Sequence, residues 1–223
     1  LGRLHPHASS DVLILGFHGN GERADHYDEW AEQFVACGAS LWVVDYRAYG
    51  LSTGRPTITS LYGDAAAFLD QMPRSLGASS RERPITKVVV WGRSLGSGPA
   101  CELAANHPDR VHGLFLDSPF ADGRSLAGRT RSGALTPDAE ALRVLDNRER
   151  MRRVHQPVRI LHGREDTLLP PSHSQELMDA CPSASKQLHV IPFATHNSLL
   201  SVGFETYFQV LGELVAEARR GTG

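Results

Sequence analysis

The sequence predicts an α/β fold in which a mainly parallel sheet of at least six strands carries helices on both faces. Six apolar runs have the length of strands, and most are continuous rather than alternating, as in strands covered on both sides. Helical patterns lie between the runs, and strands that alternate with helices build parallel sheets through right-handed crossovers. The six runs span residues 11–17, 40–44, 87–91, 111–116, 157–161 and 187–191.

The helical segments alternate with these strands along the chain. From Tyr27 to Cys37, apolar residues recur at steps of three and four, which is the spacing of an amphipathic helix. Further helices are expected over residues 61–72 and directly after residue 96, and the polar stretch 73–84 is expected to be a surface loop. The helical spacing returns from Phe204 to Val215, so the last element is predicted to be a helix.

Composition bounds the class of protein. The chain has 223 residues, and we expect residues 1–223 to form one domain. The formal net charge of −2 gives no reason to expect a nucleic-acid partner. No run approaches the ~20 apolar residues that span a bilayer, so we expect no integral membrane segment and a cytoplasmic protein. Three cysteines without metal-site spacing indicate neither a disulfide framework nor a metal centre.

An irregular stretch follows the fourth predicted strand and is rich in glycine, proline and arginine. It is too short for a second domain, and we interpret residues 119–154 as a small lid over the edge of the sheet. Within it, five arginines lie between residues 143 and 153. A solvated helix face with Asp146 as the N-cap is the favoured interpretation. The alternative is a basic surface that steers an anionic substrate or a lipid.

A Gly-Arg-Ser-Leu-Gly motif at residues 92–96 follows the third predicted strand and precedes a predicted helix. In this context, small residues on both sides of a serine allow a sharp turn that lifts the hydroxyl above the edge of the sheet. The pattern also occurs by chance, and a glycine-rich turn can serve close packing alone. The positions of the other candidate groups favour Ser94 as a nucleophile.

Three residues of the types that nucleophilic catalysis requires follow three different predicted strands. Ser94 follows the third strand, Asp166 the fifth and His196 the sixth. Because parallel strands end at one edge of the sheet, the loops that follow them converge in space. A serine hydroxyl needs a base that titrates near neutral pH, and the imidazole that supplies it needs a carboxylate to hold its tautomer. The sequence therefore predicts a catalytic triad of Ser94, Asp166 and His196.

Other residues compete for these roles. Glu165 adjoins the predicted acid and is its first alternative, and Asp45 and Asp117, which end strands, are weaker candidates. His18 and His162 end strands beside glycines, so we interpret them as histidines that brace turns.

An oxyanion that develops during acyl transfer needs hydrogen-bond donors. In a turn of this type, the backbone N–H of the residue after the nucleophile points at the oxyanion, and that residue is Leu95. A second donor comes from the loop after the first predicted strand, His-Gly-Asn-Gly at residues 18–21, and we assign it to Asn20.

Five motifs together resemble those of the α/β-hydrolases, and within them the BEM46-like group that includes the α/β-hydrolase domain-containing proteins 13 and 17. They lie at residues 18–21, 45–56, 92–96, 117–119 and 162–166. The resemblance implies a Ser-His-Asp esterase or thioesterase, and in the domain-containing protein 17 branch the removal of fatty acyl groups from protein cysteines. The group usually has two strands before the strand that leads to His18. Only residues 1–10 precede it here, so we expect the chain to begin inside the fold or to lack an edge strand.

Two rival functions remain at this point. Residues 19–24 match the GxGxxA pattern of dinucleotide-binding oxidoreductases, and Asp45 lies about where a ribose-binding acid is expected. That interpretation leaves the three predicted triad residues unexplained. A non-catalytic binding protein on the same fold is the other rival.

The sequence favours a serine hydrolase that cleaves a carboxylic ester or thioester of a small-molecule substrate through an acyl-enzyme, without a metal or cofactor. A peptidase or amidase that uses the same triad is the alternative. The acyl chain, the leaving group and the oligomeric state are left open.

Overall fold

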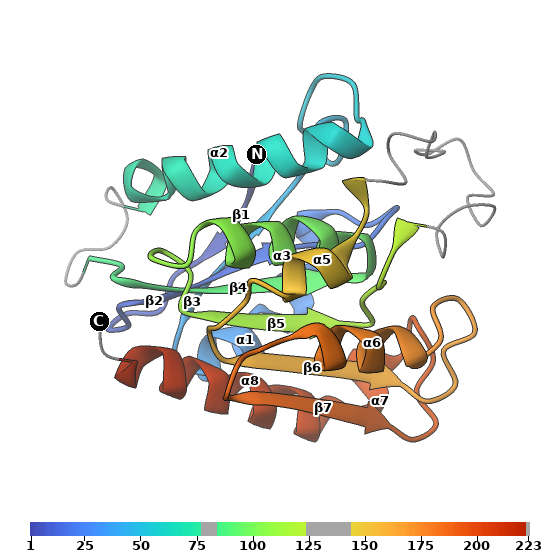
Figure 1. The fold of residues 1–223 in the computed structure, drawn as a ribbon. Helices are drawn as coiled ribbons and strands as arrows, with labels where there is room; N and C mark the ends of the chain where they lie inside the picture. Colours follow the sequence, from blue (N-terminus) through green and yellow to red (C-terminus); the bar gives the residue numbers. More distant parts are fainter. Residues whose placement is uncertain (77–83, 124–143, 222–223) are drawn as a thin grey trace.

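Seven strands form one mixed sheet in the computed structural model, which describes residues 1–76, 84–123 and 144–221 (Figure 1). The strand order is β1-β3-β2-β4-β5-β6-β7, and β1 pairs antiparallel whereas the other strands pair in parallel. The predicted α/β fold with a mainly parallel sheet is therefore confirmed. The strands are β1 (Gly2–His5), β2 (Val12–Phe17), β3 (Ser40–Val44), β4 (Lys87–Arg93), β5 (Gly113–Asp117), β6 (Val158–Gly163) and β7 (Lys186–Ile191).

The edge strand β1 is the one strand of the described sheet that the sequence pattern does not predict. It is the one described strand before β2, where the resemblance implies two, and it pairs with β3 with Leu4 opposite Trp42. Its first two residues are exposed and its last two are partly buried, so it carries no apolar run. An edge strand is held by backbone hydrogen bonds on one side only, which a short polar segment can supply.

Helices cover both faces of the sheet, as Figure 1 shows with α2 and α3 above it and α8 below it. The helices form two groups, and each group packs in a different hydrophobic core cluster. The first group is α2 (Ile58–Leu76), α3 (Ser97–Asn106), α5 (Asn147–Met151) and α6 (Ser172–Ala180). The second group is the 3₁₀ helix η1 (Ala24–Trp30), α1 (Ala31–Ala36), α7 (Leu199–Val202) and α8 (Phe204–Arg220).

The inner strand β2 shows how one strand serves both cores. Leu13 and Leu15 pack in the cluster with α2 and α3, whereas Val12 and Ile14 pack in the cluster with α1 and α8. Successive side chains of a strand point to opposite faces, so a strand covered on both faces has apolar residues at every position. This arrangement explains why the predicted strands read as continuous apolar runs.

Two predicted helix boundaries differ from the structure. The segment from Tyr27 to Cys37 is a 3₁₀ helix followed by the short helix α1, not one continuous helix. The helix predicted over residues 61–72 starts earlier and runs on to Leu76, so the loop expected from residue 73 was wrong over residues 73–76. A proline at position 73 is the usual sign of a helix end, but this helix continues past it. Residues 77–83 of that loop lie outside the described residues.

The lid that we expected over residues 119–154 lies largely outside the described residues, because residues 124–143 are not described, and it stays a prediction. In the described part of the arginine run, the carboxylate of Asp146 accepts a hydrogen bond from the Glu149 N–H, as expected of an N-cap. Arg150 is ion-paired with Glu102 at 2.5 Å, and its guanidinium lies 4.5 Å from the centre of the Tyr62 ring. This arginine therefore packs against the fold instead of forming a free basic surface.

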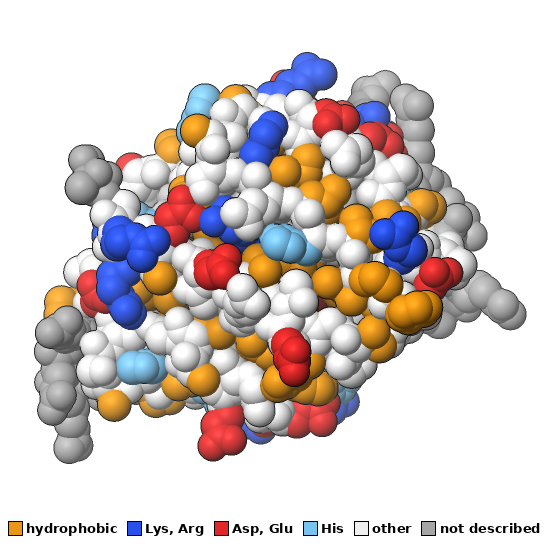
Figure 2. All heavy atoms as spheres, turned by 90° about the horizontal axis from the view of Figure 1, so that it is seen from below, with side chains coloured by type: hydrophobic (Ala, Val, Ile, Leu, Met, Phe, Trp, Pro, Cys, Tyr) orange, Lys and Arg blue, Asp and Glu red, His pale blue; other side chains and the backbone are white. Residues whose placement is uncertain are grey.

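The face seen in Figure 2 carries basic, acidic and apolar side chains interspersed over its described part. This is the face seen from below Figure 1, the side on which α8 lies. Mixed charges on this face agree with the small net charge of the chain.

A buried polar chain links the centre of the sheet to α8. The indole N–H of Trp91 donates a hydrogen bond to the Tyr207 hydroxyl at 2.7 Å, and that hydroxyl donates to Asp117 Oδ2 at 3.1 Å. All three side chains are fully buried. Buried polar groups need such partners because water cannot reach them.

Replacing Tyr207 by Phe is expected to lower the free energy of unfolding by about 1–3 kcal/mol, because the Trp91 N–H and the Asp117 carboxyl both lose a buried partner. Urea unfolding of the wild type and the variant measures this loss. The Tyr49→Phe variant is the matched control, because the Tyr49 hydroxyl donates to the exposed side chain of Asn20. An equal loss in both variants would contradict the role of the buried chain.

Candidate active site

Ser94 stands at a sharp turn between β4 and α3, in the short 3₁₀ helix η2 (Ser94–Gly96). Its φ of 50° lies in the left-handed region that residues other than glycine rarely adopt. A Cβ on Gly92 would lie 2.5 Å from the Gly96 carbonyl oxygen, and a Cβ on Gly96 would lie 2.0 Å from the Phe17 carbonyl oxygen. The two glycines of the motif are therefore required by close backbone contacts, and the predicted strand-turn-helix context is confirmed.

The structure brings Ser94, His196 and Asp166 together in one hydrogen-bonded chain. Ser94 Oγ lies 2.9 Å from His196 Nε2, and His196 Nδ1 lies 2.7 Å from Asp166 Oδ2. An ionised carboxylate only accepts hydrogen bonds, so Nδ1 carries a proton and Nε2 is free to accept the proton of the serine hydroxyl. All three residues are buried, with 4–8% of their surface exposed.

The carboxylate of Asp166 is saturated with donors. Oδ1 accepts hydrogen bonds from the backbone N–H groups of Leu168 at 2.9 Å and Leu169 at 2.8 Å, while Oδ2 faces His196 and lies 3.2 Å from His162 Nε2. Burial alone would raise the pKa of Asp166, but hydrogen bonds from His162, His196 and the Leu169 N–H outweigh it and hold the pKa well below its usual range. Asp166 therefore stays ionised beside the imidazole.

The other candidate acids lie elsewhere. Glu165 is exposed, whereas its neighbour is buried at the triad. Asp117 accepts from the Tyr207 hydroxyl, and burial raises its pKa despite the opposing charge of Arg93. Asp45 accepts from the Ala24 N–H at 2.8 Å and lies 3.2 Å from a ring nitrogen of His18. The geometry at His196 is therefore met by Asp166 and not by these three residues.

The two histidines interpreted as turn braces do contact turns. His18 Nδ1 donates to the Gly19 carbonyl oxygen at 2.9 Å. His162 Nε2 donates to the Leu169 carbonyl oxygen at 2.7 Å, and its Nδ1 lies 2.6 Å from the Ser174 hydroxyl. The ring of His162 thus holds the loop that carries the triad carboxylate.

The loop that holds Asn20 follows β2 and reaches the same edge of the sheet. The Gly19 carbonyl accepts hydrogen bonds from His18 Nδ1 and from the Glu22 N–H at 3.3 Å. These bonds fix the orientation of the peptide group between Gly19 and Asn20, and therefore the direction of the Asn20 N–H. The Tyr49 hydroxyl donates to Asn20 Oδ1 at 2.8 Å. The roles of Asn20 and Leu95 as oxyanion donors stay predictions.

Sequence reasoning did not single out Glu22 and Arg93, which join the site from both sides. The Arg93 guanidinium contacts Glu22 and also donates to the His196 carbonyl oxygen at 2.8 Å. Arg93 occupies the variable position of the serine motif, and a charged residue in a buried turn was the signal that could have indicated it. Tyr46, whose hydroxyl donates to the His18 carbonyl oxygen at 2.9 Å, is a further brace that was missed.

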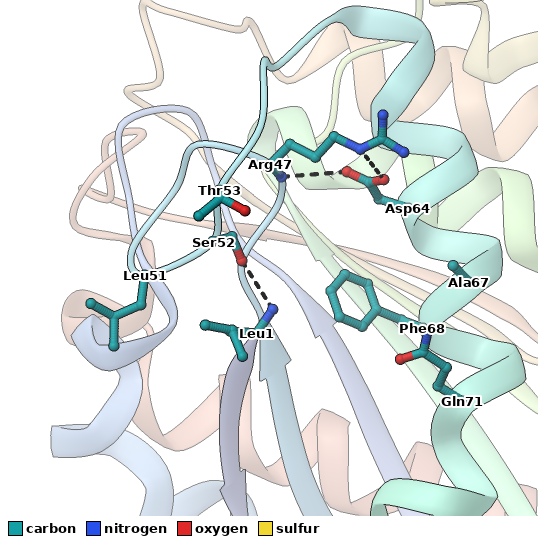
Figure 3. Close-up of a pocket in the computed structure, with 9 residues that line it drawn as sticks. All are labelled: Leu1, Arg47, Leu51, Ser52, Thr53, Asp64, Ala67, Phe68 and Gln71. Carbon is teal, nitrogen blue, oxygen red and sulfur yellow. Dashed lines mark hydrogen bonds and ion pairs between the residues drawn. The ribbon is translucent and has the colours of Figure 1, made fainter.

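A pocket of about 490 Å³ lies between α2 and the loop after β3 (Figure 3). Arg47 Nε donates to Asp64 Oδ1 at 2.8 Å on its wall, and this ion pair attaches the loop to α2. None of the three triad residues lines the pocket. Asp45 does not line this pocket either, and its carboxylate is occupied by the Ala24 N–H and a ring nitrogen of His18.

The fold and the serine, histidine and aspartate at its carboxyl edge define an α/β hydrolase. Among solved structures, a monoacylglycerol lipase from Paleococcus ferrophilus is 20% identical with a TM-score of 0.73, and the match covers 97% of this chain and 99% of that one. The esterase Pf2001 of Pyrococcus furiosus is 20% identical with a TM-score of 0.75, covering 94% of this chain and 84% of that one. At this level of identity the similarity is one of fold.

The family model described as serine aminopeptidase, S33, matches residues 8–137 and 139–201, so the chain belongs to this family of α/β hydrolases. Among curated proteins, bem46 of Schizosaccharomyces pombe is 30% identical over 215 residues, which are 93% of this chain and 68% of that protein. The α/β-hydrolase domain-containing protein aho-3 of Caenorhabditis elegans is 30% identical over 197 residues, 88% of this chain and 55% of that protein.

The α/β-hydrolase domain-containing protein 17C of Mus musculus is 27% identical over 213 residues, which are 92% of this chain and 59% of that protein. This chain thus spans between 55% and 68% of the length of these curated relatives. The matches confirm the predicted resemblance to the BEM46-like group. Among the helices of the described residues, none combines the length and apolar character that crossing a bilayer requires.

Acid is expected to remove the stabilising contribution of Asp166. Because its pKa is lowered in the folded state, the contribution is complete above the unfolded pKa of about 4 and is lost as the pH falls through the folded value. The difference in unfolding free energy between the wild type and Asp166→Asn should therefore shrink as the pH is lowered below about 4. Urea unfolding at successive pH values measures it, and a difference that stays constant over that range would contradict the lowered pKa.

Proposed function

We propose that this protein is a serine hydrolase that cleaves a carboxylic ester or thioester through an acyl-enzyme intermediate. The observation that carries the proposal is the hydrogen-bonded chain from Ser94 through His196 to Asp166 at the carboxyl edge of the sheet. Ser94 is the nucleophile, His196 the general base and acid, and Asp166 the group that orients and stabilises the imidazole.

In the first half of the reaction, Ser94 Oγ attacks the carbonyl carbon of the substrate while its proton passes to His196 Nε2. The carbonyl oxygen becomes an oxyanion, and the backbone N–H groups of Leu95 and Asn20 are the proposed donors to it. The bond to the leaving alcohol or thiol then breaks, and the leaving group takes the proton from His196. Ser94 is left as an acyl ester.

In the second half, a water molecule attacks the acyl carbon and gives its proton to His196 Nε2. The tetrahedral intermediate collapses, the carboxylic acid leaves, and the proton returns to Ser94. The ionised Asp166 stabilises the imidazolium each time it forms, because it accepts the hydrogen bond from Nδ1 at 2.7 Å.

Two of the solved structures with this fold are named as a lipase and an esterase, and this supports an ester as the bond cleaved. The description of the family as serine aminopeptidase favours amide hydrolysis as the second candidate. Both reactions use the same triad, and they differ in the leaving group that His196 must protonate.

Replacing Ser94 by Ala is expected to lower kcat by roughly 10⁴–10⁶-fold, because no other group in the chain of hydrogen bonds can form the acyl ester. Turnover of a short p-nitrophenyl ester measures the loss. Labelling with a fluorophosphonate probe tests the same atom directly, because the probe forms a covalent bond with an activated serine oxygen.

The Ser172→Ala variant is the matched control, since Ser172 is an exposed serine at the start of α6. It should keep both turnover and labelling. Circular dichroism should show that the Ser94→Ala variant is folded. Full activity in a folded Ser94→Ala variant would end the proposal, and so would a wild type that neither turns over esters nor reacts with the probe.

A substrate panel separates the ester from the amide candidate. We expect p-nitrophenyl esters and acyl thioesters to be cleaved with a higher kcat/KM than aminoacyl p-nitroanilides, and steady-state kinetics on one enzyme preparation compares them. An anilide that is cleaved faster than the matched aminoacyl ester would reverse the order of the two candidates.

A further inference from the structure

Arg93, the residue before the proposed nucleophile, ties together three segments of the site. It belongs to the end of β4, its Nη1 is ion-paired with Glu22 on the loop after β2, and its Nη2 donates to the His196 carbonyl oxygen at 2.8 Å. Nη2 also lies 3.3 Å from Asn197 Oδ1. One planar guanidinium therefore bridges the loop before η1 and the loop after β7.

Glu22 extends this bridge to the backbone of the loop that holds Asn20. Its Oε2 accepts hydrogen bonds from the Gly19 N–H and from the Tyr27 hydroxyl, both at 2.7 Å. A Cβ on Gly19 would lie 2.9 Å from Arg93 Nη1, so the loop backbone closes directly onto the guanidinium. The contact fixes Gly19 from two directions, one residue before Asn20.

Both members of the pair are largely removed from water. The exposed fraction of the side chain is 12% for Arg93 and 22% for Glu22. Burial alone would raise the pKa of Glu22, but the charge of Arg93, the Tyr27 hydroxyl and the Gly19 N–H outweigh it and lower the pKa. The two side chains are therefore an ionised pair, and removing one member leaves the other charge without its partner.

We propose that the Arg93–Glu22 pair is a positioning device that holds the Asn20 loop and the His196 loop at their working distance around Ser94. The inference rests on the proposed function, because it assigns work to the pair only in the reaction that Ser94 and His196 carry out. Arg93 and Glu22 act through the backbone of other residues, and neither transfers a proton or forms a bond with the substrate.

A fault in positioning has a specific kinetic signature. When reacting groups shift by about 1 Å, the chemical step can slow by about 10²-fold although substrate still binds. Loss of the bridge should therefore lower kcat and leave KM nearly unchanged. A side chain that only stabilises the fold would instead lower the amount of active enzyme and leave the kcat of each active molecule as it was.

The surface offers a way to restore the missing group. A pocket of about 220 Å³ is lined by Glu22, Arg93, Asn197 and Ser201 among others, so the guanidinium borders an open space. When the arginine side chain is removed, a free guanidinium ion from solution can enter beside Glu22. It carries the same charge and the same planar set of donors.

The experiment compares the wild type with Arg93→Ala in turnover of a p-nitrophenyl ester, with active sites counted by fluorophosphonate titration. We expect kcat per active site to fall by roughly 10–100-fold, with KM changed by less than about threefold. Millimolar guanidinium should restore a large part of kcat, and the same concentrations of urea or sodium chloride should not.

Arg110→Ala is the matched control. Arg110 also pairs with a carboxylate, Asp70 at 2.6 Å, and donates to a carbonyl oxygen, that of Leu69 at 2.7 Å, but it precedes β5 at the opposite edge of the sheet. Its kcat per active site should equal that of the wild type and should not respond to guanidinium. Ser94→Ala should stay inactive with guanidinium present.

Glu22→Gln tests the other half of the bridge and decides the case if Arg93→Ala does not fold. Its amide oxygen can still accept from the Gly19 N–H, but it has lost the charge that holds Arg93. We expect Glu22→Gln to have a lower kcat at unchanged KM. Because both residues serve one bridge, the variant that combines Arg93→Ala with Glu22→Gln should lose no more kcat than the more impaired of the two single variants.

Several results would overturn the positioning role. The role is excluded if folded Arg93→Ala keeps the wild-type kcat per active site, or if its kcat falls and guanidinium does not restore it. If Arg93→Ala does not fold, a wild-type kcat in Glu22→Gln excludes the role. If the wild type labels and turns over esters in these cases, only this inference fails. If the wild type does neither, the proposed function fails, and the inference fails with it.

Discussion

The close backbone contact between the turn at Ser94 and the end of β2 sets the geometry on which the active-site edge depends. A Cβ at Gly96 would stand 2.0 Å from the Phe17 carbonyl oxygen, so a larger residue would push the two segments apart. Phe17 leads directly into the loop that contains Asn20, and this contact therefore also places that loop beside Ser94. The strand order changes direction here, with β3 and β4 on opposite sides of β2, and such points open a crevice between loops.

Sheet polarity then explains how residues far apart in sequence meet. Ser94 and His196 are separated by 102 positions, and Asp166 and His196 by 30, yet each follows a parallel strand and reaches the same edge. Two buried clusters, one on each face of the sheet, hold these strands in register. Ser94, Asp166 and His196 are not members of these clusters, which instead hold the strands that carry them. A packed scaffold of this kind can keep side chains at set distances.

The sequence was sufficient for features that depend on pattern and order. Continuous apolar runs predicted six strands, and strand ends predicted that Ser94, Asp166 and His196 would lie together. Features that leave no pattern of apolar runs or strand ends in the sequence were not predictable. The edge strand β1 has no apolar run, and it is held by backbone pairing with β3 together with side-chain contacts such as the Arg3–Asp28 ion pair. The pairing of Arg93 with Glu22 joins residues 71 positions apart, and no local spacing indicates which acid an arginine will reach.

The pairing of Arg93 with Glu22 has an electrostatic reason as well as a geometric one. In the proposed mechanism a positive charge develops on His196, and an unpaired guanidinium on the same residue's carbonyl would oppose it. Glu22 compensates Arg93, and the buried Asp117, 3.9 Å from Arg93 Nε, adds a second acidic group on that side. Asp166 then faces the imidazole as an ionised carboxylate. The guanidinium can therefore hold the His196 loop without penalising the imidazolium that the reaction must form.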